Sequence, residues 1–380
     1  MLEVRYVGNT SKLSWRTSNL NEVDIFGNGF LEEFKNAQRN LAINQAAGVN
    51  SFQYRGLPGQ VPLPIFDAAF GARGGVPPIA PVLFGVLSSS STSSHQADVR
   101  ARLTDVIAAS GAEAVAVAYF DPATGEELLL RAEESFHAAS LMKVPVMMEV
   151  FRQAQEGRLS LDERLIVKNE FRSLADGSAF ALTAESDSDP ALYEKIGHAV
   201  TIRELVRAMI VRSSNLATNL LIERVTAARV QELMETIGAS GMRVLRGVED
   251  RRAFERGLNN TTTARAMLVI FRHLLEGRVI SRESSEAMVR ILLDQEFNDG
   301  IPAGLPADVR VAHKTGAITR IAHDAGIVYP PLGPPYVLVV LTRGIAEERS
   351  ANRLIAEISR LLYEHTLRRR AERERFPRRS

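Results

Sequence analysis

Three short strings that lie far apart in the chain constrain its fold more than any other feature. They are Ser140–Lys143 (S-L-M-K), Ser213–Asn215 (S-S-N) and Lys314–Gly316 (K-T-G), and two of the chain's only six lysines fall inside them. A desolvated lysine can lose and regain a proton, whereas arginine stays protonated at any working pH. The strings therefore indicate a serine nucleophile in a lysine-centred proton network. If they act together, the fold must bring all three strings to one site.

The first string has the spacing of a helix face. Ser140 and Lys143 are three residues apart, so their side chains would lie one turn apart on the same face. Apolar residues recur at helical spacing beyond them, and Pro145 is tolerated only near the first turn, which predicts a helix that begins near Ser140. Free N–H groups at a helix start can polarise an acyl oxygen. The structural alternative is a capping serine beside a solvated lysine.

The second string interrupts a helical pattern that runs from Val200 to Leu221. Two helices are predicted, broken at Ser213 and Ser214, with one of these serines capping the second helix. Ser213 could relay a proton to a leaving group, and Asn215 could orient both the lysine and a substrate amide. The structural alternative is a capping serine and an asparagine that joins two helices.

The third string follows an alternating apolar run that begins at Val309, which predicts that it lies at the end of a strand. Gly316 would let this strand approach a bound substrate closely. Lys314 and Thr315 would then face a substrate carboxylate. The structural alternative is an edge lysine before a glycine turn.

In this order and spacing, the three strings resemble the signature of penicillin-binding proteins and class A β-lactamases. The resemblance covers roughly the last 280 residues. It includes Val200–Leu205 before the second string, Thr261–Met267, and a terminal helix from Glu347 to about His365. The implied fold is α/β (α+β): an antiparallel sheet flanked by the N- and C-terminal helices, with an inserted all-helical domain.

The resemblance assigns roles to the residues of the strings. Ser140 would be acylated, Lys143 would act as general base for acylation, Ser213 would relay protons and Asn215 would orient the substrate. Substrate binding would involve the third string and the residue after it, namely Lys314, Thr315, Gly316 and Ala317. The backbone N–H groups of Ser140 and Ala317 would form the oxyanion hole.

A glutamate for deacylation is expected between Gly238 and Thr261. Class A β-lactamases use it to activate water, and the related transpeptidases lack it. Glu249 lies 36 residues after Ser213, close to the family position, although two residues rather than one separate it from Arg246. Competing carboxylates lie nearby at Asp250 and Glu255. The structural alternative for Glu249 is an ion pair with one of the loop arginines Arg246, Arg251 and Arg252.

Two further positions depart from the family pattern. Ser214 stands where the family favours aspartate. The usual carboxylate-binding arginine has no unambiguous counterpart; Arg320 is a candidate, and His323–Asp324 occupy the expected stretch.

These observations favour a serine β-lactamase that confers antibiotic resistance as a monomer acting on a small β-lactam, without metal or cofactor. One alternative is a penicillin-binding D-Ala-D-Ala peptidase or esterase that deacylates β-lactams slowly. Another is a catalytically silent binding or wall-anchoring module. Such an enzyme is expected in the periplasm or outside the cell, although the N-terminus shows no signal-peptide pattern.

Composition narrows the alternatives. The chain has no cysteine, which excludes disulfides and a thiol nucleophile, and neither H-E-x-x-H nor G-x-S-x-G occurs. A net charge of +1 gives no reason to expect nucleic acid or a charged membrane surface as a partner, and no apolar stretch is long enough for membrane insertion.

The domain boundary is expected at a serine-rich stretch, Ser88–Ser94. Residues 1–96 are predicted to be a poorly ordered N-terminal extension and linker, with one amphipathic helix over Phe30–Gln45. Residues 97–380 would form the catalytic domain, whose α/β part comprises 97–139 and 300–370 and whose helical part comprises 140–299. The strands predicted for it are Ala114–Phe120, Glu126–Arg131, Val309–Ala312, Ala325–Tyr329 and Tyr336–Thr342.

Overall fold

The computed structural model describes residues 30–49, 54–63 and 96–375, and the serine-rich stretch Ser88–Ser94 lies outside these ranges. The chain divides into two compact units, Met1–Ser93 and Ser94–Ser380. In the first unit, helix α1 (Phe30–Ala46) is present where a helix was predicted. Its Asn40 side chain accepts a bond from the Val61 N–H at 2.9 Å and donates one to the Val61 carbonyl at 2.7 Å.

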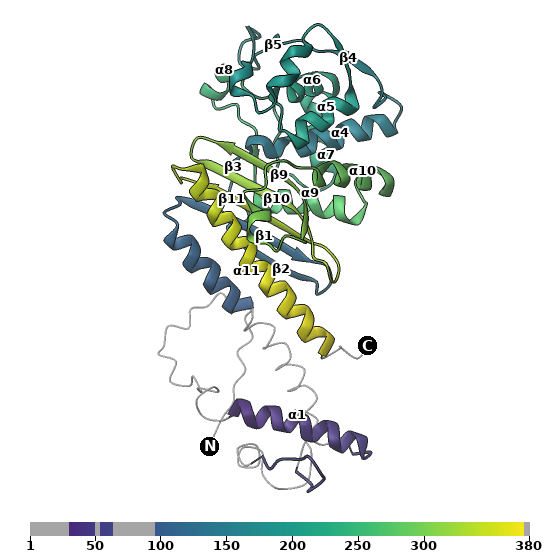
Figure 1. The fold of residues 1–380 in the computed structure, drawn as a ribbon, viewed down its shortest axis with the longest axis vertical. Helices are drawn as coiled ribbons and strands as arrows, with labels where there is room; N and C mark the ends of the chain where they lie inside the picture. Colours follow the sequence, from purple (N-terminus) through teal and green to yellow (C-terminus); the bar gives the residue numbers. More distant parts are fainter. Residues whose placement is uncertain (1–29, 50–53, 64–95, 376–380) are drawn as a thin grey trace. The chain divides into compact units, whose positions relative to one another are not determined.

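The second unit is built on one five-stranded antiparallel sheet, in the order β2-β1-β11-β10-β9 (Figure 1). Its strands are β1 (Ala114–Asp121), β2 (Glu126–Leu130), β9 (Arg310–Ile318), β10 (Ile321–Tyr329) and β11 (Tyr336–Arg343). Strand β9 lies at the edge, paired only with β10. One backbone edge of β9 is therefore open to a neighbour other than a strand.

The strand that carries the third string is longer than predicted. Strand β9 pairs with β10 continuously from Arg310 opposite Tyr329 to Ile318 opposite Ile321. The prediction that Lys314–Gly316 ends the strand was therefore wrong, because the tight β9–β10 hairpin extends both strands past the point where apolar alternation stops. The string lies inside the edge strand.

Period-two alternation gives the sheet two apolar faces. In β1, Val115, Val117 and Tyr119 join a core with the helix at residues 96–109 and with α11 (Glu348–Arg375). The intervening Ala114, Ala116 and Ala118 join the larger core on the opposite face. The predicted fold class is confirmed: the first and last helices of this unit cover one face of an antiparallel sheet.

The other face of the sheet is covered by α9 (Ala264–Glu276) and α10 (Arg282–Leu293). Both helices fall in the segment 140–299 that the sequence assigned to the helical part, but α9 contacts β1, β10 and β11, and α10 contacts β9. Burial explains this position, because the inward residues of α9 are apolar at helical spacing, among them Met267, Ile270, Phe271 and Leu274.

Helix α4 (Lys143–Gln155) is buried along most of its length. It contacts α5 (Ile202–Val211), α6 (Asn215–Val225) and α7 (Ala227–Thr236). The short helix α8 (Arg251–Glu255) follows in the chain. Four short 3₁₀ helices are η1 (Ala139–Met142), η2 (Ala184–Ser186), η3 (Pro190–Lys195) and η4 (Ile301–Gly304). Three two-stranded ladders pair β3 (Phe136–His137) with β8 (Thr261–Thr262), β4 (Arg164–Ile166) with β7 (Ala199–Thr201), and β5 (Phe171–Arg172) with β6 (Ala179–Phe180).

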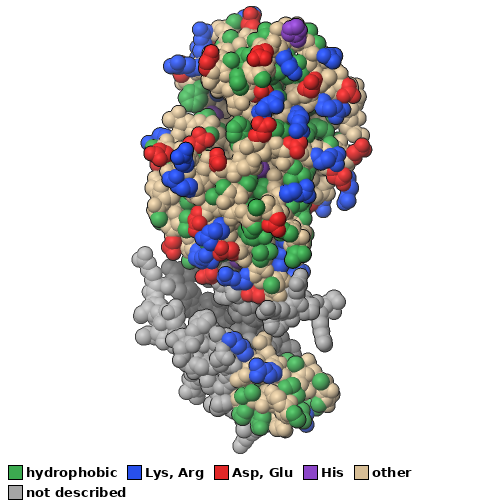
Figure 2. All heavy atoms as spheres, in the orientation of Figure 1, with side chains coloured by type: hydrophobic (Ala, Val, Ile, Leu, Met, Phe, Trp, Pro, Cys, Tyr) green, Lys and Arg blue, Asp and Glu red, His purple; other side chains and the backbone are tan. Residues whose placement is uncertain are grey.

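Acidic and basic side chains are interspersed over the face of the second unit shown in Figure 2. Many of them form exposed ion pairs within one helix, such as Arg360 with Glu357 and Glu364 on α11. Exposed pairs of this kind contribute little to stability individually. Among the described residues, no helix combines the length and apolarity that a membrane crossing requires.

Candidate active site

Ser140 lies in the 3₁₀ turn η1, and the α-helix α4 begins at Lys143. The predicted helix start is thus present, with the serine in the tighter turn that precedes it. Ala139 has a left-handed backbone with φ of +46°, which turns the chain sharply before the serine. A Cβ on Gly316 would lie 3.0 Å from the Ser140 backbone nitrogen, so this glycine lets β9 pack against η1.

Lys143 is completely buried and donates three hydrogen bonds from Nζ. The acceptors are the Ser213 carbonyl at 2.6 Å, Ser213 Oγ at 3.1 Å and Asn215 Oδ1 at 2.8 Å. Burial lowers the pKa of Lys143 to about 7, and the carboxylates of Asp187 and Glu249 oppose that effect. The desolvation that proton transfer by a lysine requires is present, because Lys143 is completely buried. A neutral amine has only two N–H donors, so deprotonation frees one lone pair in this site.

Ser213 lies between two lysines. Its backbone is left-handed, with φ of +58°, in the break between α5 and α6. Its Oγ accepts from Lys143 at 3.1 Å and from Lys314 Nζ at 3.0 Å. The predicted cap of the second helix is Ser214, whose Oγ accepts from the Ala217 N–H at 3.3 Å. Ser213 is thereby left to join the first and third strings.

Lys314 is also completely buried, and it donates to Ser213 Oγ and to the Thr315 carbonyl, both at 3.0 Å. Burial and the neighbouring charge of Lys143 hold the pKa of Lys314 well below its ordinary value. Because both lysines bond to the same hydroxyl, the charge of one disfavours the charge of the other. This arrangement suits a site that moves single protons.

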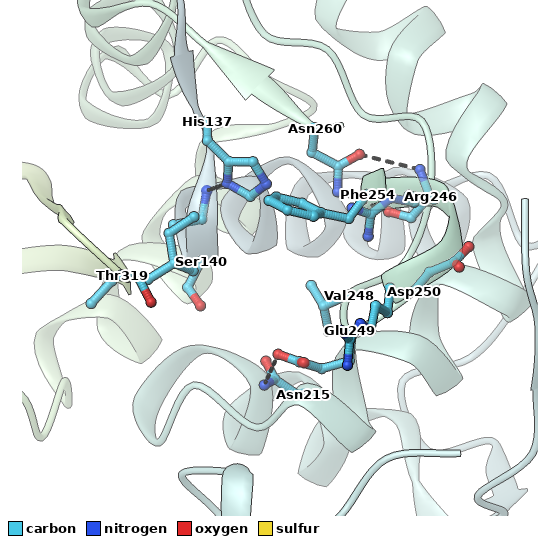
Figure 3. Close-up of a pocket in the computed structure, with 14 residues that line it drawn as sticks. His137, Ser140, Asn215, Arg246, Val248, Glu249, Asp250, Phe254, Asn260 and Thr319 are labelled. Carbon is cyan, nitrogen blue, oxygen red and sulfur yellow. Dashed lines mark hydrogen bonds between the residues drawn. The ribbon is translucent and has the colours of Figure 1, made fainter. Parts of the chain in front are cut away.

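Glu249 points across the cavity toward Asn215, facing Ser140 (Figure 3). Its Oε1 accepts from Asn215 Nδ2 at 3.4 Å, and its backbone is left-handed with φ of +59°. Left-handed backbone in a non-glycine residue costs about 1–3 kcal/mol and concentrates at functional sites. Ala139, Ser213 and Glu249 are three of the six such residues found in the described part of the chain.

The ion pairs considered for Glu249 are not formed by any of the three loop arginines. Arg251 pairs with Glu255 at 2.9 Å, and Arg252 pairs with Asp176 at 3.4 Å. Arg246 is nearly buried and donates to the carbonyls of Leu258 and Gly247 and to the Asn259 side chain.

The competing carboxylates have other partners. Asp250 caps α8 and accepts from Ser173 Oγ at 2.7 Å and from the Leu174 N–H at 2.8 Å. Glu255 is exposed in its pair with Arg251. Glu249 is thus the loop carboxylate that the structure brings to Ser140 and Asn215.

Arg320 is not brought to the site, contrary to its candidacy as a carboxylate-binding residue. It lies in the β9–β10 turn, where its guanidinium donates to Glu113 at 2.5 Å and to the Gly344 carbonyl at 2.9 Å. The residues that line the two cavities at Ser140 do not include it. A turn residue at the end of an edge hairpin projects beyond the strands, away from the strand centre where Lys314 lies.

The stretch His323–Asp324 is buried and has structural partners. His323 Nε2 donates to the His137 carbonyl at 2.9 Å, and Nδ1 accepts from the Thr342 N–H at 3.2 Å. Asp324 accepts from His313 at 2.8 Å and from the Ile301 N–H at 2.8 Å. His323 joins β10 to the strand before η1 and so supports the turn that holds Ser140.

His323 predicts a pH dependence of stability. Burial lowers its pKa from 6.5 to about 4, so acidification protonates the unfolded chain first. The contribution of His323 to the free energy of unfolding is therefore at its full value above about pH 6.5. It falls by about 3 kcal/mol as the pH is lowered toward 4. Denaturant unfolding at pH 7, 5.5 and 4.5 should show this decline, and His323→Gln should flatten it. An equally steep decline in that variant would contradict the assignment to His323.

Two cavities meet at the nucleophile, with volumes of about 370 and 300 Å³. Their shared lining consists of Ser140, Asn215, Glu249 and Ala317. The larger one is also lined by His137 and Phe254, whose rings meet edge to face (Figure 3). The site is therefore a cleft with a polar floor at the three strings and an apolar wall. Within the described ranges, no three acidic or histidine side chains form a group that could hold a metal ion.

Sequence reasoning missed two residues that contact the second string. Asp187 accepts from the backbone N–H groups of Asn215 and Leu216. Ser188 Oγ donates to the Ser213 carbonyl at 3.1 Å. Both belong to an irregular segment between η2 and η3, where no periodicity distinguishes a buried acidic residue from an exposed turn. An acidic residue shortly before Pro190 was the one available signal, and it is equally typical of a surface turn.

Known proteins share this architecture. Residues 98–366 match the family described as "Beta-lactamase enzyme family". A β-lactamase of Streptomyces fradiae is 30% identical over 250 residues, which cover 64% of this chain and 79% of that protein. A solved β-lactamase from Sphaerobacter thermophilus has 27% identity and a TM-score of 0.61, covering 71% of this chain and 97% of its own. A structure of PBP-A has 25% identity and a TM-score of 0.61, covering 71% and 96%. From its fold, its three strings and these matches, the chain belongs to the β-lactamase enzyme family.

Proposed function

We propose that this protein is a serine β-lactamase, which hydrolyses the β-lactam amide through an acyl intermediate on Ser140. The observation that carries the proposal is that Ser140, Ser213 and Glu249 line one cavity. The hydroxyl of Ser213 accepts hydrogen bonds from the two buried lysines, Lys143 and Lys314. Asn215 connects this network to Glu249, because its Oδ1 accepts from Lys143 and its Nδ2 donates to the carboxylate. The names of the relatives, β-lactamases of several bacteria, support the same activity.

Acylation begins with neutral Lys143 as base. Ser140 Oγ attacks the β-lactam carbonyl carbon, and its proton passes to Lys143. The backbone N–H groups of Ser140 and Ala317 receive the oxygen that becomes negative. As the C–N bond breaks, Ser213 gives its proton to the ring nitrogen and regains one from a lysine bonded to its Oγ. The product is an ester on Ser140 with the opened ring attached.

The substrate carboxylate is held by Lys314 and Thr315 in this proposal. Arg320 takes no part, because Glu113 and the Gly344 carbonyl occupy its guanidinium. Asn215 spans the site, since its Oδ1 accepts from Lys143 while its Nδ2 donates to Glu249. It can therefore orient both the base and the substrate amide.

In this proposal Glu249 is the general base for deacylation. Its carboxylate takes a proton from a water molecule as that water attacks the ester carbon, and Ser140 Oγ leaves with the proton returned to it. If Glu249 does not position this water, the same site would act as a penicillin-binding peptidase or esterase. The likeness to PBP-A gives that second candidate its support.

An intact-mass time course with one penicillin tests the proposal. An adduct on Ser140 that forms and disappears while the drug is consumed is the expected result. An adduct that persists would favour the penicillin-binding alternative. If no adduct forms and the drug stays intact, both catalytic hypotheses are contradicted. That result would favour a binding module without catalytic activity.

The acylation rate is expected to depend on the Lys143 amine. Because its pKa is about 7, the rate should fall about tenfold per pH unit below pH 7, as the base becomes protonated. Lys143→Arg should lose acylation at every pH, since arginine stays charged. Stopped-flow acylation between pH 5 and 9 measures both. The matched control is Lys168→Arg, an exposed lysine paired with Glu223 at 2.8 Å, which should leave the profile unchanged. A flat acid limb in the wild type would contradict the role of Lys143.

A further inference from the structure

The Asp187 carboxylate is enclosed by hydrogen-bond donors. It is 7% exposed, and it accepts from the backbone N–H groups of Asn215 at 3.0 Å, Leu216 at 2.9 Å and Asp189 at 3.1 Å. Tyr193 Oη donates to it as well, at 3.0 Å. Four donors and no acceptor surround the group, so an ionised carboxylate satisfies the pocket, whereas an amide would direct an NH₂ group at donors.

Two of these donors are the first N–H groups of helix α6, which begins at Asn215. Those N–H groups have no partner within the helix, and the positive end of the helix dipole favours a negative charge there. Ser214 already caps the helix through the Ala217 N–H, so Asp187 completes the cap at the two preceding positions. The carboxylate thereby fixes the backbone of Asn215, whose side-chain Oδ1 accepts a hydrogen bond from Lys143.

We propose that Asp187 is a positioning residue for catalysis, which holds Asn215 against Lys143 and supplies the negative charge that the second string lacks at Ser214. The charge comes from a segment outside the three strings. The proposal rests on the proposed function for its catalytic meaning, but its structural claim concerns Lys143 directly.

The charged and titratable groups that face Lys143 come from several elements. Asp187 and Glu249 raise its pKa, Lys314 lies across Ser213 on β9, and Tyr193 donates to Asp187 from η3. Without the Asp187 charge, Glu249 is the one carboxylate named here that still counteracts the lowering of the Lys143 pKa by burial. The pKa of Lys143 should fall further, so that the amine stays neutral to lower pH.

The test is a titration of labelled lysine side chains by NMR, which only six lysines make tractable. The Lys143 signal is assigned by its absence in Lys143→Gln. In Asp187→Asn we expect the Lys143 midpoint to move down by about one pH unit. We also expect acylation by penicillin at the pH-independent plateau to slow by about tenfold. The matched control is Asp189→Asn, a buried carboxylate two residues away that pairs with Arg212 at 3.0 Å and should leave the midpoint in place.

An unchanged midpoint in folded Asp187→Asn, or an equal shift in Asp189→Asn, would overturn the proposal. If Asp187→Asn does not fold, amide hydrogen exchange of the wild type decides. The Asn215 and Leu216 amide protons should exchange slowly because both N–H groups donate hydrogen bonds to the Asp187 carboxylate. Fast exchange of both would overturn the proposal. The lysine titration and the amide exchange measurement need no substrate, unlike the acylation rate. A wild type that fails to hydrolyse penicillin would therefore defeat the proposed function without touching the result for Asp187.

Discussion

Replacement of Ser140 by alanine is expected to abolish both covalent labelling by penicillin and its hydrolysis, with a loss of at least about 10⁴-fold in kcat/KM. Its hydroxyl is the nucleophile in the proposed mechanism, at the mouth of the buried network formed by Lys143, Ser213 and Lys314. Without Oγ no ester can form, and the oxyanion hole alone supports little turnover. Intact-mass labelling and loss of the drug's absorbance measure the two effects.

The fold should tolerate this change, because Ser140 is only partly buried and alanine differs by one oxygen. A matched control is Ser160→Ala, an exposed loop serine whose Oγ accepts only from the Asp162 N–H at 3.2 Å, and it should retain full activity. Labelling that survives in Ser140→Ala would place the nucleophile elsewhere and refute the proposed function.

Replacement of Glu249 by glutamine is expected to leave acylation nearly intact and to slow deacylation by about 10³-fold. The amide preserves the size of the side chain but cannot take the proton of the attacking water. The acyl-enzyme should therefore accumulate to nearly one equivalent and persist, where the wild type shows it only transiently. An intact-mass time course over seconds to hours separates the two rates.

The matched control in the same loop is Glu255→Gln, whose carboxylate pairs with Arg251 on the exposed face of α8. It should turn over penicillin at the wild-type rate. Wild-type turnover by Glu249→Gln would show that another group activates the water. Failure of that variant to acylate would instead show that Glu249 acts in the first step, as a partner of Asn215.

Much of the local structure could be predicted because it depends on short-range patterns. The helix start near Ser140 follows from helical spacing and Pro145, and the cap at Ser214 follows from a hydroxyl placed before an apolar run. The strands of the large sheet were predicted from their apolar runs, and the flanking helices were expected from the resemblance to the family.

Other features depend on contacts between distant segments, and sequence patterns do not carry them. Strand β9 extends to Ile318 because β10 pairs with it, not because its own residues alternate. Arg320 stands close to the third string in sequence, yet it pairs with Glu113, the residue before β1. Helix α9 belongs to the sheet face because its apolar side packs in the same core as the alanines of β1, and α10 contacts β9 on that face.

The sequence by itself determined which side chains the proposed chemistry can use: two serines, two lysines and an asparagine in three strings, because nucleophilic catalysis requires those side-chain types at short local spacings. The tertiary structure decided which of the nearby charges belong to the site. In the folded chain Glu249 accepts a hydrogen bond from Asn215, and Arg320 donates to Glu113 outside the site. Asp187, from an irregular segment, accepts from the first N–H groups of α6. The physical reason is that burial and hydrogen bonding depend on the assembled fold. A charged side chain is stable in a buried site only where the surrounding groups supply its hydrogen-bond or ionic partners.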